Sequence, residues 1–465
     1  MSPPPPDRAP AHGGTRPALL TGWGRTAPTA ARVARPRTAE QVAEALSRAG
    51  ARGALARGLG RSYGDAAQAA GGLVLDCTAL TGPVRLDTVR GEATAPAGIP
   101  LGGLAAHLLR RGHFVPVAPG TGQVTLGGAV AADVHGKNHH ADSSIGAHVR
   151  ALTLVTPDGR ARALGPEGDG SELFWATVGG MGLTGVVTEV TLAVFPVETA
   201  YMRVDTDRTA GLDATLELMS RPGSDRRYSV CWVDLLAAGG AMGRGVFTRA
   251  DHARIGDLPS TLRREPLRHR PGTVLAAPPW APPGLLNRWT AGAFNAAYLR
   301  AAPRRRRGEA KPLAGFFHPL DAVRGWNRMY GPRGLVQYQF VVPFGAEDTL
   351  AAVMERLSRA GAPSFLTVLK RMGEPTPAPL SFPRPGWTLA VDLPADLPGL
   401  GRLLDALDER LLEAGGRLYL AKDSRARAET VHAMYPELPA WRRVRDRADP
   451  GGVLVSDLAR RLRLV

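Results

Sequence analysis

Three glycine-rich segments in the N-terminal half of this chain have the composition of loops that bind phosphate. They are Ala56-Arg57-Gly58-Leu59-Gly60-Arg61-Ser62-Tyr63-Gly64-Asp65, the segment 119–128, and Gly179-Gly180-Met181-Gly182-Leu183-Thr184-Gly185. Glycine has no Cβ and adopts positive φ, so backbone N–H groups in such loops can approach a ligand closely. A single glycine cluster is weak evidence, because ordinary tight turns have the same composition. Three clusters in one predicted domain favour a large diphosphate cofactor, with its pyrophosphate on N–H groups of the first two loops.

A polar run, His135-Gly136-Lys137-Asn138-His139-His140, follows the second glycine-rich segment and could reach the same ligand. A metal site would need a carboxylate at ligand spacing, and only Asp142 comes near that, so we expect no bound metal ion. We favour a role for His135 as a hydrogen-bonding group beside the ligand. A purely structural histidine is the alternative.

Short apolar runs and turn residues predict the elements that position these loops. The segment Pro157-Asp158-Gly159 has the composition of a hairpin turn. Strands and helices alternate without the regularity of a doubly wound sheet, which predicts an α+β domain. In this half we expect helices at 38–50, 101–111 and 171–178, and strands at 53–56, 72–76, 149–156, 160–164 and 185–194.

The composition of the sequence and the pattern of its predicted elements change at about residue 197. The segment 240–312 is rich in proline, arginine and glycine and has little periodicity, so we expect it to be flexible. The remainder predicts an antiparallel sheet backed by helices, with strands at 228–234, 334–342, 364–370 and 387–393 and helices at 347–360 and 398–414. The predicted organisation is a disordered tail at 1–17, a cofactor-binding domain at 18–196, a substrate-binding domain at 197–414, and a C-terminal segment at 415–465 that returns to the first domain.

Composition narrows the class of protein and its compartment. The formal net charge is +16, but the arginines are scattered, and the one block, Arg304 to Arg307, has no aromatic residues between its members. This pattern argues against nucleic-acid binding and suits anionic, phosphate-bearing substrates or membrane surfaces. Cys77 and Cys231 have no metal or redox spacing, which is typical of reduced thiols in a cytoplasmic protein. We expect a cytoplasmic protein, with peripheral membrane contact as an open alternative.

Longer segments give the chain a family resemblance. The glycine-rich loops, the 135–140 run and the segment 172–180 resemble the flavin domain of the vanillyl-alcohol-oxidase (PCMH-type) FAD enzymes. The similarity runs from about residue 21 to the C-terminus and weakens in 240–312. Within this family the chain is most similar to members that oxidise the 2′-hydroxyl of a polyprenyl-phosphoryl-β-D-ribose, the first half of an epimerisation that supplies the arabinose donor for cell-wall arabinan in actinobacteria. The resemblance implies an FAD-dependent oxidoreductase with a two-domain α+β fold, in which an antiparallel sheet forms the substrate domain.

The resemblance also implies a set of FAD contacts, of which the residues themselves support only the glycine-rich loops. In covalent members of the wider superfamily a histidine in the first loop bonds the flavin, and Arg61 stands at the matching position here. We therefore expect FAD to be bound non-covalently. The expected cofactor residues are Ala56, Arg57, Gly58, Leu59, Gly60, Arg61, Ser62, Tyr63, Gly64, Asp65, Ala66, Gly120, Thr125, Leu126, Gly127, Gly128, Ala132, Asp133, Val134, His135, Val187 and Tyr419.

Oxidation of a secondary alcohol requires a group that binds the hydroxyl and takes its proton. Lys422 is our candidate: with a lowered pKa it would act as the base, and with its charge retained it would orient the hydroxyl. A salt bridge to Asp423 is the alternative, and His135 is the second catalytic candidate. Lys370 would suit the phosphate of a lipid-linked sugar as a point charge. The other expected substrate residues are Gln337 and Gln339, which share one face of a strand, and Trp232, Phe317, Thr388 and Ala390.

Two other functions stay open at this point. The same flavin scaffold would serve a sugar-alcohol or aldonolactone oxidase that uses oxygen, and a non-catalytic flavin-binding protein is a third hypothesis. At its start the chain has no Gly-x-Gly-x-x-Gly after a strand, so the reductive half of an epimerisation would fall to a separate NAD(P)H-dependent short-chain reductase.

Overall fold

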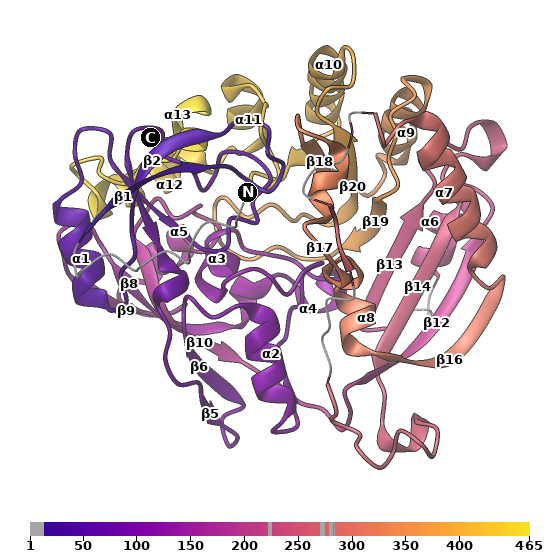
Figure 1. Cartoon of the computed structure of the whole chain (residues 1–465), viewed down its shortest axis with the longest axis horizontal. Helices are drawn as coiled ribbons and strands as arrows, with labels where there is room; N and C mark the ends of the chain where they lie inside the picture. The colour runs from indigo at the N-terminus through magenta and orange to yellow at the C-terminus, as the bar shows by residue number, and fades with distance from the viewer. Residues whose placement is uncertain (1–13, 222–225, 270–274, 279–281, 283) are drawn as a thin grey trace, which may run out of the picture.

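The computed structural model describes residues 14–221, 226–269, 275–278, 282 and 284–465. Two sheet-based halves face each other in Figure 1, the first half with the C-terminal helices on one side and an eight-stranded sheet on the other. The chain therefore has the expected α+β, two-domain organisation. No helix within the described ranges combines the length and the apolar composition needed to cross a bilayer.

The first domain contains two main sheets. A mixed sheet has the order β1-β2-β4-β3, and an antiparallel sheet has the order β5-β6-β10-β8-β9. A short pair, β11 with β7, leads out of the domain. The strands are β1 (Arg16–Leu20), β2 (Thr29–Ala34), β3 (Ala54–Arg57), β4 (Leu73–Asp76), β5 (Arg85–Asp87), β6 (Glu92–Pro96), β7 (His113–Phe114), β8 (Val149–Val155), β9 (Ala161–Leu164), β10 (Val186–Ala193) and β11 (Phe195–Pro196).

Helices and the C-terminal segment complete this domain. Thr38 caps α1, because its side chain accepts a hydrogen bond from the Gln41 backbone N–H. The C-terminal segment lies beside β3, where the backbone N–H of Ala54 donates to Val453 O at 2.7 Å. The helices are α1 (Ala39–Ser47), α2 (Leu101–Leu109), α3 (Leu126–Ala131), α4 (His139–Asp142), α5 (Ser171–Thr177), α11 (Ala428–Met434), α12 (Leu438–Ala448) and α13 (Asp457–Arg461).

The second domain is built on an eight-stranded antiparallel sheet of order β16-β12-β14-β13-β19-β20-β18-β21. A parallel pair, β15 with β17, lies outside this sheet. The strands are β12 (Tyr201–Thr209), β13 (Tyr228–Val233), β14 (Gly245–His252), β15 (Leu275–Ala276), β16 (Arg305–Pro312), β17 (Val323–Arg324), β18 (Leu335–Pro343), β19 (Thr367–Met372), β20 (Gly386–Pro394) and β21 (Arg417–Leu418). The helices are α6 (Leu212–Ser220), α7 (Arg288–Ala301), α8 (Leu313–Phe317), α9 (Glu347–Arg359) and α10 (Leu400–Glu413).

Alternation along each strand separates the two faces of this sheet. On β18, Tyr338 and Phe340 belong to the core that includes α6, α9 and α10, whereas Gln337 and Gln339 line a cavity on the other face. Apolar side chains of α9 and α10 bury that core face. Strand β18 therefore presents polar side chains to the cavity and apolar ones to the helices.

The segment 240–312 differs from the flexible region that we expected. It contains β14, α7 and β16, and β14 pairs with both β12 and β13 inside the sheet. The periodicity was hidden because charged residues on these strands form ion pairs across the sheet, as Arg249 does with Asp205 and Arg307 does with Asp207. Residues 270–274, 279–281 and 283 of this segment lie outside the described residues.

The disordered tail that we expected at 1–17 does not include Arg16 and Pro17, which belong to a strand. Residues 1–13 lie outside the described part of the chain, but β1 begins at Arg16 and pairs antiparallel with β2. The strand is exposed along most of its length, so it lacks the apolar alternation that would have predicted it.

Candidate active site

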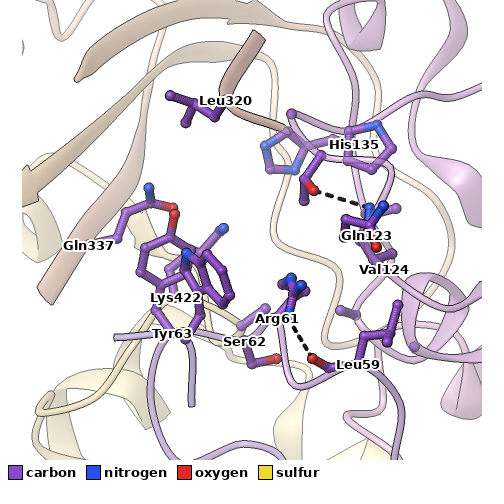
Figure 2. A pocket seen from close by; sticks show the side chains of 18 of the residues that line it. Leu59, Arg61, Ser62, Tyr63, Gln123, Val124, His135, Leu320, Gln337 and Lys422 are labelled. Carbon is purple, nitrogen blue, oxygen red and sulfur yellow. Dashed lines mark hydrogen bonds between the residues drawn. The ribbon is translucent and has the colours of Figure 1, made fainter. Parts of the chain in front are cut away.

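A cavity of about 850 Å³ lies between the glycine-rich loops of the first domain and the polar face of the eight-stranded sheet. Its size is near the upper end of the range for small-molecule and cofactor pockets. Figure 2 shows Leu59, Arg61 and Ser62 of the first loop on one side, with Lys422, Tyr63 and Gln337 near one another. The cavity thus connects the glycine-rich loop, where we expect the cofactor, to the polar side chains that we expect to bind the substrate.

The first glycine-rich loop has the geometry of an anion-binding site. The backbone N–H groups from Gly58 to Ser62 donate to no acceptor in the described part of the chain, although these residues line the cavity. Gly60 has a φ of 62°, in the left-handed region that favours glycine. A Cβ on Gly58 would lie 2.1 Å from Thr125 Oγ1, so glycine is required for the two loops to meet. Successive unpaired N–H groups of this kind fit a pyrophosphate.

Part of the second loop is used within the protein itself. Its Gly127 N–H donates to Ala97 O at 2.9 Å and its Gly128 N–H to Thr125 Oγ1 at 3.2 Å. These two N–H groups therefore form the start of α3. The N–H groups of Gly120 and Thr121 donate to no acceptor among the described residues, so a share of the pyrophosphate for the second loop stays a prediction. Both glycines still line the cavity, as does Gly182 of the third loop.

Most of the expected site residues line this cavity. The lining includes Lys422, His135, Lys370, Gln337, Gln339, Trp232, Phe317, Ala390, Ala56, Arg57, Gly58, Leu59, Gly60, Arg61, Ser62, Tyr63, Ala66, Gly120, Thr125, Gly127, Gly128, Ala132, Val134, Val187 and Tyr419. It leaves out Gly64, Asp65, Leu126, Asp133 and Thr388.

Each of these five has a packing or supporting contact within the protein, and its expected role at the cofactor or substrate stays a prediction. The Asp133 carboxylate is buried and accepts hydrogen bonds from Ser144, Thr376 and Ser381, so it joins the two domains. Asp65 pairs with an arginine of α13, and Leu126 is a core residue of α3. Gly64 packs so closely on the C-terminal segment that a Cβ would lie 2.0 Å from Asp423 O, and Thr388 Oγ1 donates to Phe340 O behind the cavity wall.

His135 is buried in the cavity wall beside Tyr419 and Phe382. Gln339 Nε2 lies 3.0 Å from His135 Nε2 and donates to it, which leaves the ring proton on Nδ1. The Nδ1 atom has no hydrogen-bond partner in the described ranges. Burial lowers the pKa of His135 well below its usual value, and the charge of Lys370 lowers it further. A neutral imidazole with a free N–H donor suits a bound cofactor.

Lys422 lies at the centre of a polar cluster on the substrate side. Its Nζ is 4.1 Å from the centroid of the Tyr63 ring. Burial lowers the pKa of Lys422 to about 8, and the nearby carboxylate of Asp392 opposes that shift. Gln337 Nε2 donates to Asp392 Oδ1, and Asp392 Oδ2 has no partner among the residues described. Burial raises the pKa of Asp392 to about 7, whereas the hydrogen bond from Gln337 and the charge of Lys422 act in the opposite direction.

Two more lysines line the same cavity. Burial lowers the pKa of Lys370 to about 7, and the charges of Lys422 and Lys137 lower it further. Burial also lowers the pKa of Lys137 to about 7, and its Nζ donates to Phe316 O and lies 4.3 Å from the Phe316 ring centroid. Three clustered amines give this region a positive potential whenever they are protonated.

Aromatic side chains form the apolar walls. Trp232 lines the cavity and donates from Nε1 to Phe365 O at 2.9 Å. Phe317 packs edge-on against Tyr228 at a centroid distance of 4.9 Å. Tyr419 is held by a hydrogen bond from its OH to Ala132 O. These contacts fix the shape of the cavity.

Asp392 and Lys137 were missed as site residues. Lys137 belongs to the polar run that drew attention to His135, so its position in the sequence was a usable signal. Asp392 shares a strand face with Ala390, two residues earlier, and that spacing was the only local indication. Its partner Gln337 is 55 residues away in the chain.

Comparisons with known proteins agree with this geometry. Residues 30–165 match the FAD binding domain family, and residues 393–462 match the D-arabinono-1,4-lactone oxidase family. The chain is 46% identical to the decaprenylphosphoryl-beta-D-ribose oxidase of Mycolicibacterium smegmatis, over 96% of this chain and 97% of that protein. It is 43% identical to an uncharacterized protein in the mprA 5′ region of Streptomyces coelicolor, over 78% of this chain and 99% of that protein.

A more distant relative is the L-gulono-1,4-lactone dehydrogenase of Mycobacterium tuberculosis, 24% identical over 92% of this chain and 95% of that protein. The match to FAD binding domains confirms FAD as the cofactor. The unpaired N–H groups of the first loop and the free Nδ1 of His135 fit that group.

Proposed function

Because the chain belongs to the family of FAD-dependent oxidases that includes decaprenylphosphoryl-β-D-ribose oxidase, we propose that it oxidises the 2′-hydroxyl of a polyprenyl-phosphoryl-β-D-ribose to the 2-keto sugar. This is the first half of an epimerisation to an arabinose donor. The observation that carries the proposal is a pair of desolvated amines, Lys370 and Lys422, in one cavity with a phosphate-binding loop. One amine suits the sugar hydroxyl and the other suits the phosphate.

The first glycine-rich loop would hold the cofactor by its pyrophosphate. FAD, when bound, supplies the acceptor for the hydride that leaves the carbinol carbon. The N–H groups from Gly58 to Ser62 would bind the phosphates, and His135 would donate from Nδ1 to the ring system. The Arg61 guanidinium lies over the Trp23 ring, 4.1 Å from its centroid, and would form no covalent bond to the flavin.

Lys422 binds the reacting hydroxyl in this proposal. A pKa of about 8 gives a substantial fraction of neutral amine near physiological pH, so Lys422 Nζ can accept the hydroxyl proton as the C–H bond breaks. Asp392, bonded to Gln337, lies near enough to favour the ammonium form that results. The proton therefore ends on Lys422, beside a carboxylate that stabilises it.

Lys370 and the glutamines would bind the rest of the head group. The phosphate stabilises the ammonium form of Lys370, so substrate binding raises a pKa that burial has lowered. Gln337 and Gln339 present amides on the same face of β18 for the ribose hydroxyls. Trp232 and Phe317 cover the apolar faces of the sugar and the start of the prenyl chain.

The product would pass to a separate NAD(P)H-dependent short-chain reductase, because a 2-keto sugar must be reduced from the opposite face to invert the centre. The prenyl chain of the substrate resides in a membrane, so we place the protein on the cytoplasmic side, in peripheral contact with that membrane.

Anaerobic flavin reduction tests the proposal. Adding a polyprenyl-phosphoryl ribose should bleach the flavin absorbance, whereas free ribose should leave it unchanged. Bleaching by free ribose as fast as by the lipid-linked sugar would contradict the role of the phosphate and lipid.

The match of residues 393–462 to the D-arabinono-1,4-lactone oxidase family favours one alternative, an oxidase of soluble polyols or lactones. The same assay distinguishes this alternative from the proposed function. Rapid peroxide formation in air with an aldonolactone or alditol, without bleaching by the lipid-linked ribose, would establish that alternative instead.

A further inference from the structure

The helix α7 presents an apolar face to solvent. Trp289 is 84% exposed, Phe294 47% and Tyr298 44%, and Ala293 and Ala297 between them are exposed as well. With about 100° of rotation per residue, Trp289, Ala293, Ala297 and Phe294 lie within an arc of about 140° on the exposed side of α7, and Tyr298 lies at the edge of that arc, next to the buried side. Exposed aromatic residues in a contiguous group mark an interaction surface more often than isolated ones do.

Contacts on the inner side of α7 fix this orientation. Asn295 is buried, and its Nδ2 donates to Asp234 Oδ1 at 2.8 Å and to Ser364 O at 3.2 Å. Ala291, one turn earlier, is also buried. The helix cannot turn its aromatic residues inward without breaking these bonds, so the apolar face stays outward.

Basic residues flank this face without acidic ones. The sequence has no aspartate or glutamate from residue 266 to residue 308. Within this stretch, Arg288 and Arg300 lie near the two ends of α7, and the block from Arg304 to Arg307 follows it. Arg288, Arg300 and Arg304 form no ion pair with a carboxylate in the parts of the chain that the structure describes. The surroundings of the face therefore attract anions.

The apolar face continues into the cavity. Tyr298 lies on both, because it is 44% exposed and also lines the cavity wall. Its ring packs on Trp232 at a centroid distance of 4.6 Å. In Figure 1, α7 lies at the edge of the second domain, over the strands that carry that wall. A prenyl chain leaving the cavity past Trp232 would meet the edge of this face at Tyr298.

We propose that the outward face of α7, formed by Trp289, Ala293, Phe294, Ala297 and Tyr298, docks on the surface of an anionic lipid membrane. The inference rests on the proposed function, since a prenyl-linked substrate is presented by a membrane. Fourteen helical residues span roughly 21 Å, less than the ~30 Å hydrocarbon core, so α7 lies in the plane of the interface. Aromatic residues on one face with arginines at the margins are typical of interfacial helices.

A second copy of the chain suits this face less well. A twofold contact would bring the arginines of one copy against those of the other, which opposes association. Anionic headgroups instead complement the arginines while the acyl region receives the aromatic rings. The charge pattern therefore selects the membrane as occupant.

Vesicle flotation tests the proposal on the FAD-loaded full chain. The protein should float with phosphatidylglycerol vesicles, bind much less to phosphatidylcholine vesicles, and detach as salt is raised. Trp289→Ser should weaken partitioning by about tenfold, because one large exposed ring no longer inserts. Val89→Ser, on the turn after β5 and 95% exposed, is the matched control and should bind like the unmodified chain.

Quenching adds a direct readout of contact. Vesicles with brominated acyl chains should quench tryptophan fluorescence in the unmodified chain, and Trp289→Phe should lose most of that quenching while still floating. Unchanged flotation of Trp289→Ser would overturn the proposal. So would a change in sedimentation mass on Trp289→Ser with vesicle binding intact, which would identify a self-association surface. Flavin reduction by a detergent-dispersed substrate should be the same in Trp289→Ser, so failure of the proposed function would appear in that assay and not in flotation.

Discussion

Arg461 of α13 binds the carboxylate of Asp65 through two hydrogen bonds, with Nη2 2.7 Å from Oδ1 and Nε 2.9 Å from Oδ2. Its Nη1 also lies 2.8 Å from Asp423 Oδ2, directly after Lys422 in the chain. Asp65 ends the first glycine-rich loop. One guanidinium therefore ties the cofactor loop and the candidate catalytic lysine to the C-terminal helix, in the bidentate geometry that favours arginine over lysine.

Arg461→Gln should weaken FAD binding by about tenfold or more, because it leaves two partly buried carboxylates facing each other without a cation. Arg461→Lys should recover only part of the affinity, since an ammonium cannot bind both oxygens in the same plane. A titration monitored by FAD fluorescence measures the FAD affinity of both variants. Arg463→Gln removes an exposed pair with Glu429 and is the control. Equal FAD affinity in Arg461→Gln and Arg463→Gln would contradict the role of Arg461.

Lys422→Met should slow flavin reduction by about 10²- to 10⁴-fold, the usual contribution of a general base, with FAD binding retained. In the unmodified chain the reduction rate should rise as pH increases through about 8, because burial lowers the pKa of Lys422 and only the neutral amine accepts a proton. Anaerobic stopped-flow absorbance across pH 6 to 10 measures this, with those limits chosen to bracket the Lys422 pKa at about two units each side.

Lys422→Arg separates the two roles open to this residue. An arginine stays charged, so it can orient a hydroxyl but cannot take its proton. Near-normal reduction in the arginine variant, without the rise in rate with pH, would show that Lys422 acts through its charge. Normal reduction in the methionine variant would remove Lys422 from the mechanism.

Strands buried on both sides were the most predictable part of the fold. The apolar runs of β13, β18 and β20 predicted them within one or two residues, because both of their faces contact other parts of the protein. Strands β12, β14 and β16 gave no such signal. Their alternate positions carry charged residues that pair across the sheet: Arg249 lies 3.6 Å from Asp205, and Arg307 lies 2.7 Å from Asp207. Such pairs are visible only once the strands are adjacent.

The residues of the candidate site also divide into those that the sequence could predict and those that it could not. Glycine-rich loops with unpaired N–H groups were recognisable from composition, since only glycine permits the approach of Gly58 to Thr125. Residues whose role depends on burial could not be recognised from the sequence. Asp392 is unremarkable in the sequence, and its raised pKa comes from desolvation beside Gln337 and Lys422. Asp133 was expected at the cofactor but binds hydroxyl groups that lie far away in the chain.

Lys370→Met should reduce the affinity for the phosphorylated substrate by about tenfold, the effect of losing one charge-assisted hydrogen bond. In the unmodified chain that affinity should fall as pH rises above about 7, because burial lowers the pKa of Lys370 and the neutral amine no longer attracts the phosphate. The variant should lose this dependence and keep its limiting rate of flavin reduction. Lys311→Met, at the cavity rim and paired with Glu309, is the control. An equal loss of affinity in both variants would point to general electrostatics.

FAD should dissociate completely when the protein is denatured. The position that bonds the flavin in covalent relatives is Arg61, whose guanidinium lies 4.1 Å from the Trp23 ring centroid and donates to Leu59 O at 2.8 Å. A guanidinium stays protonated at physiological pH and is then not a nucleophile. Unfolding in guanidinium chloride followed by ultrafiltration should therefore transfer all flavin absorbance to the filtrate, and Arg61→Ala should do the same after binding FAD less tightly. Flavin absorbance retained with the polypeptide would refute non-covalent binding and require a nucleophile elsewhere in the cavity, where the His135 ring would be the first residue to replace.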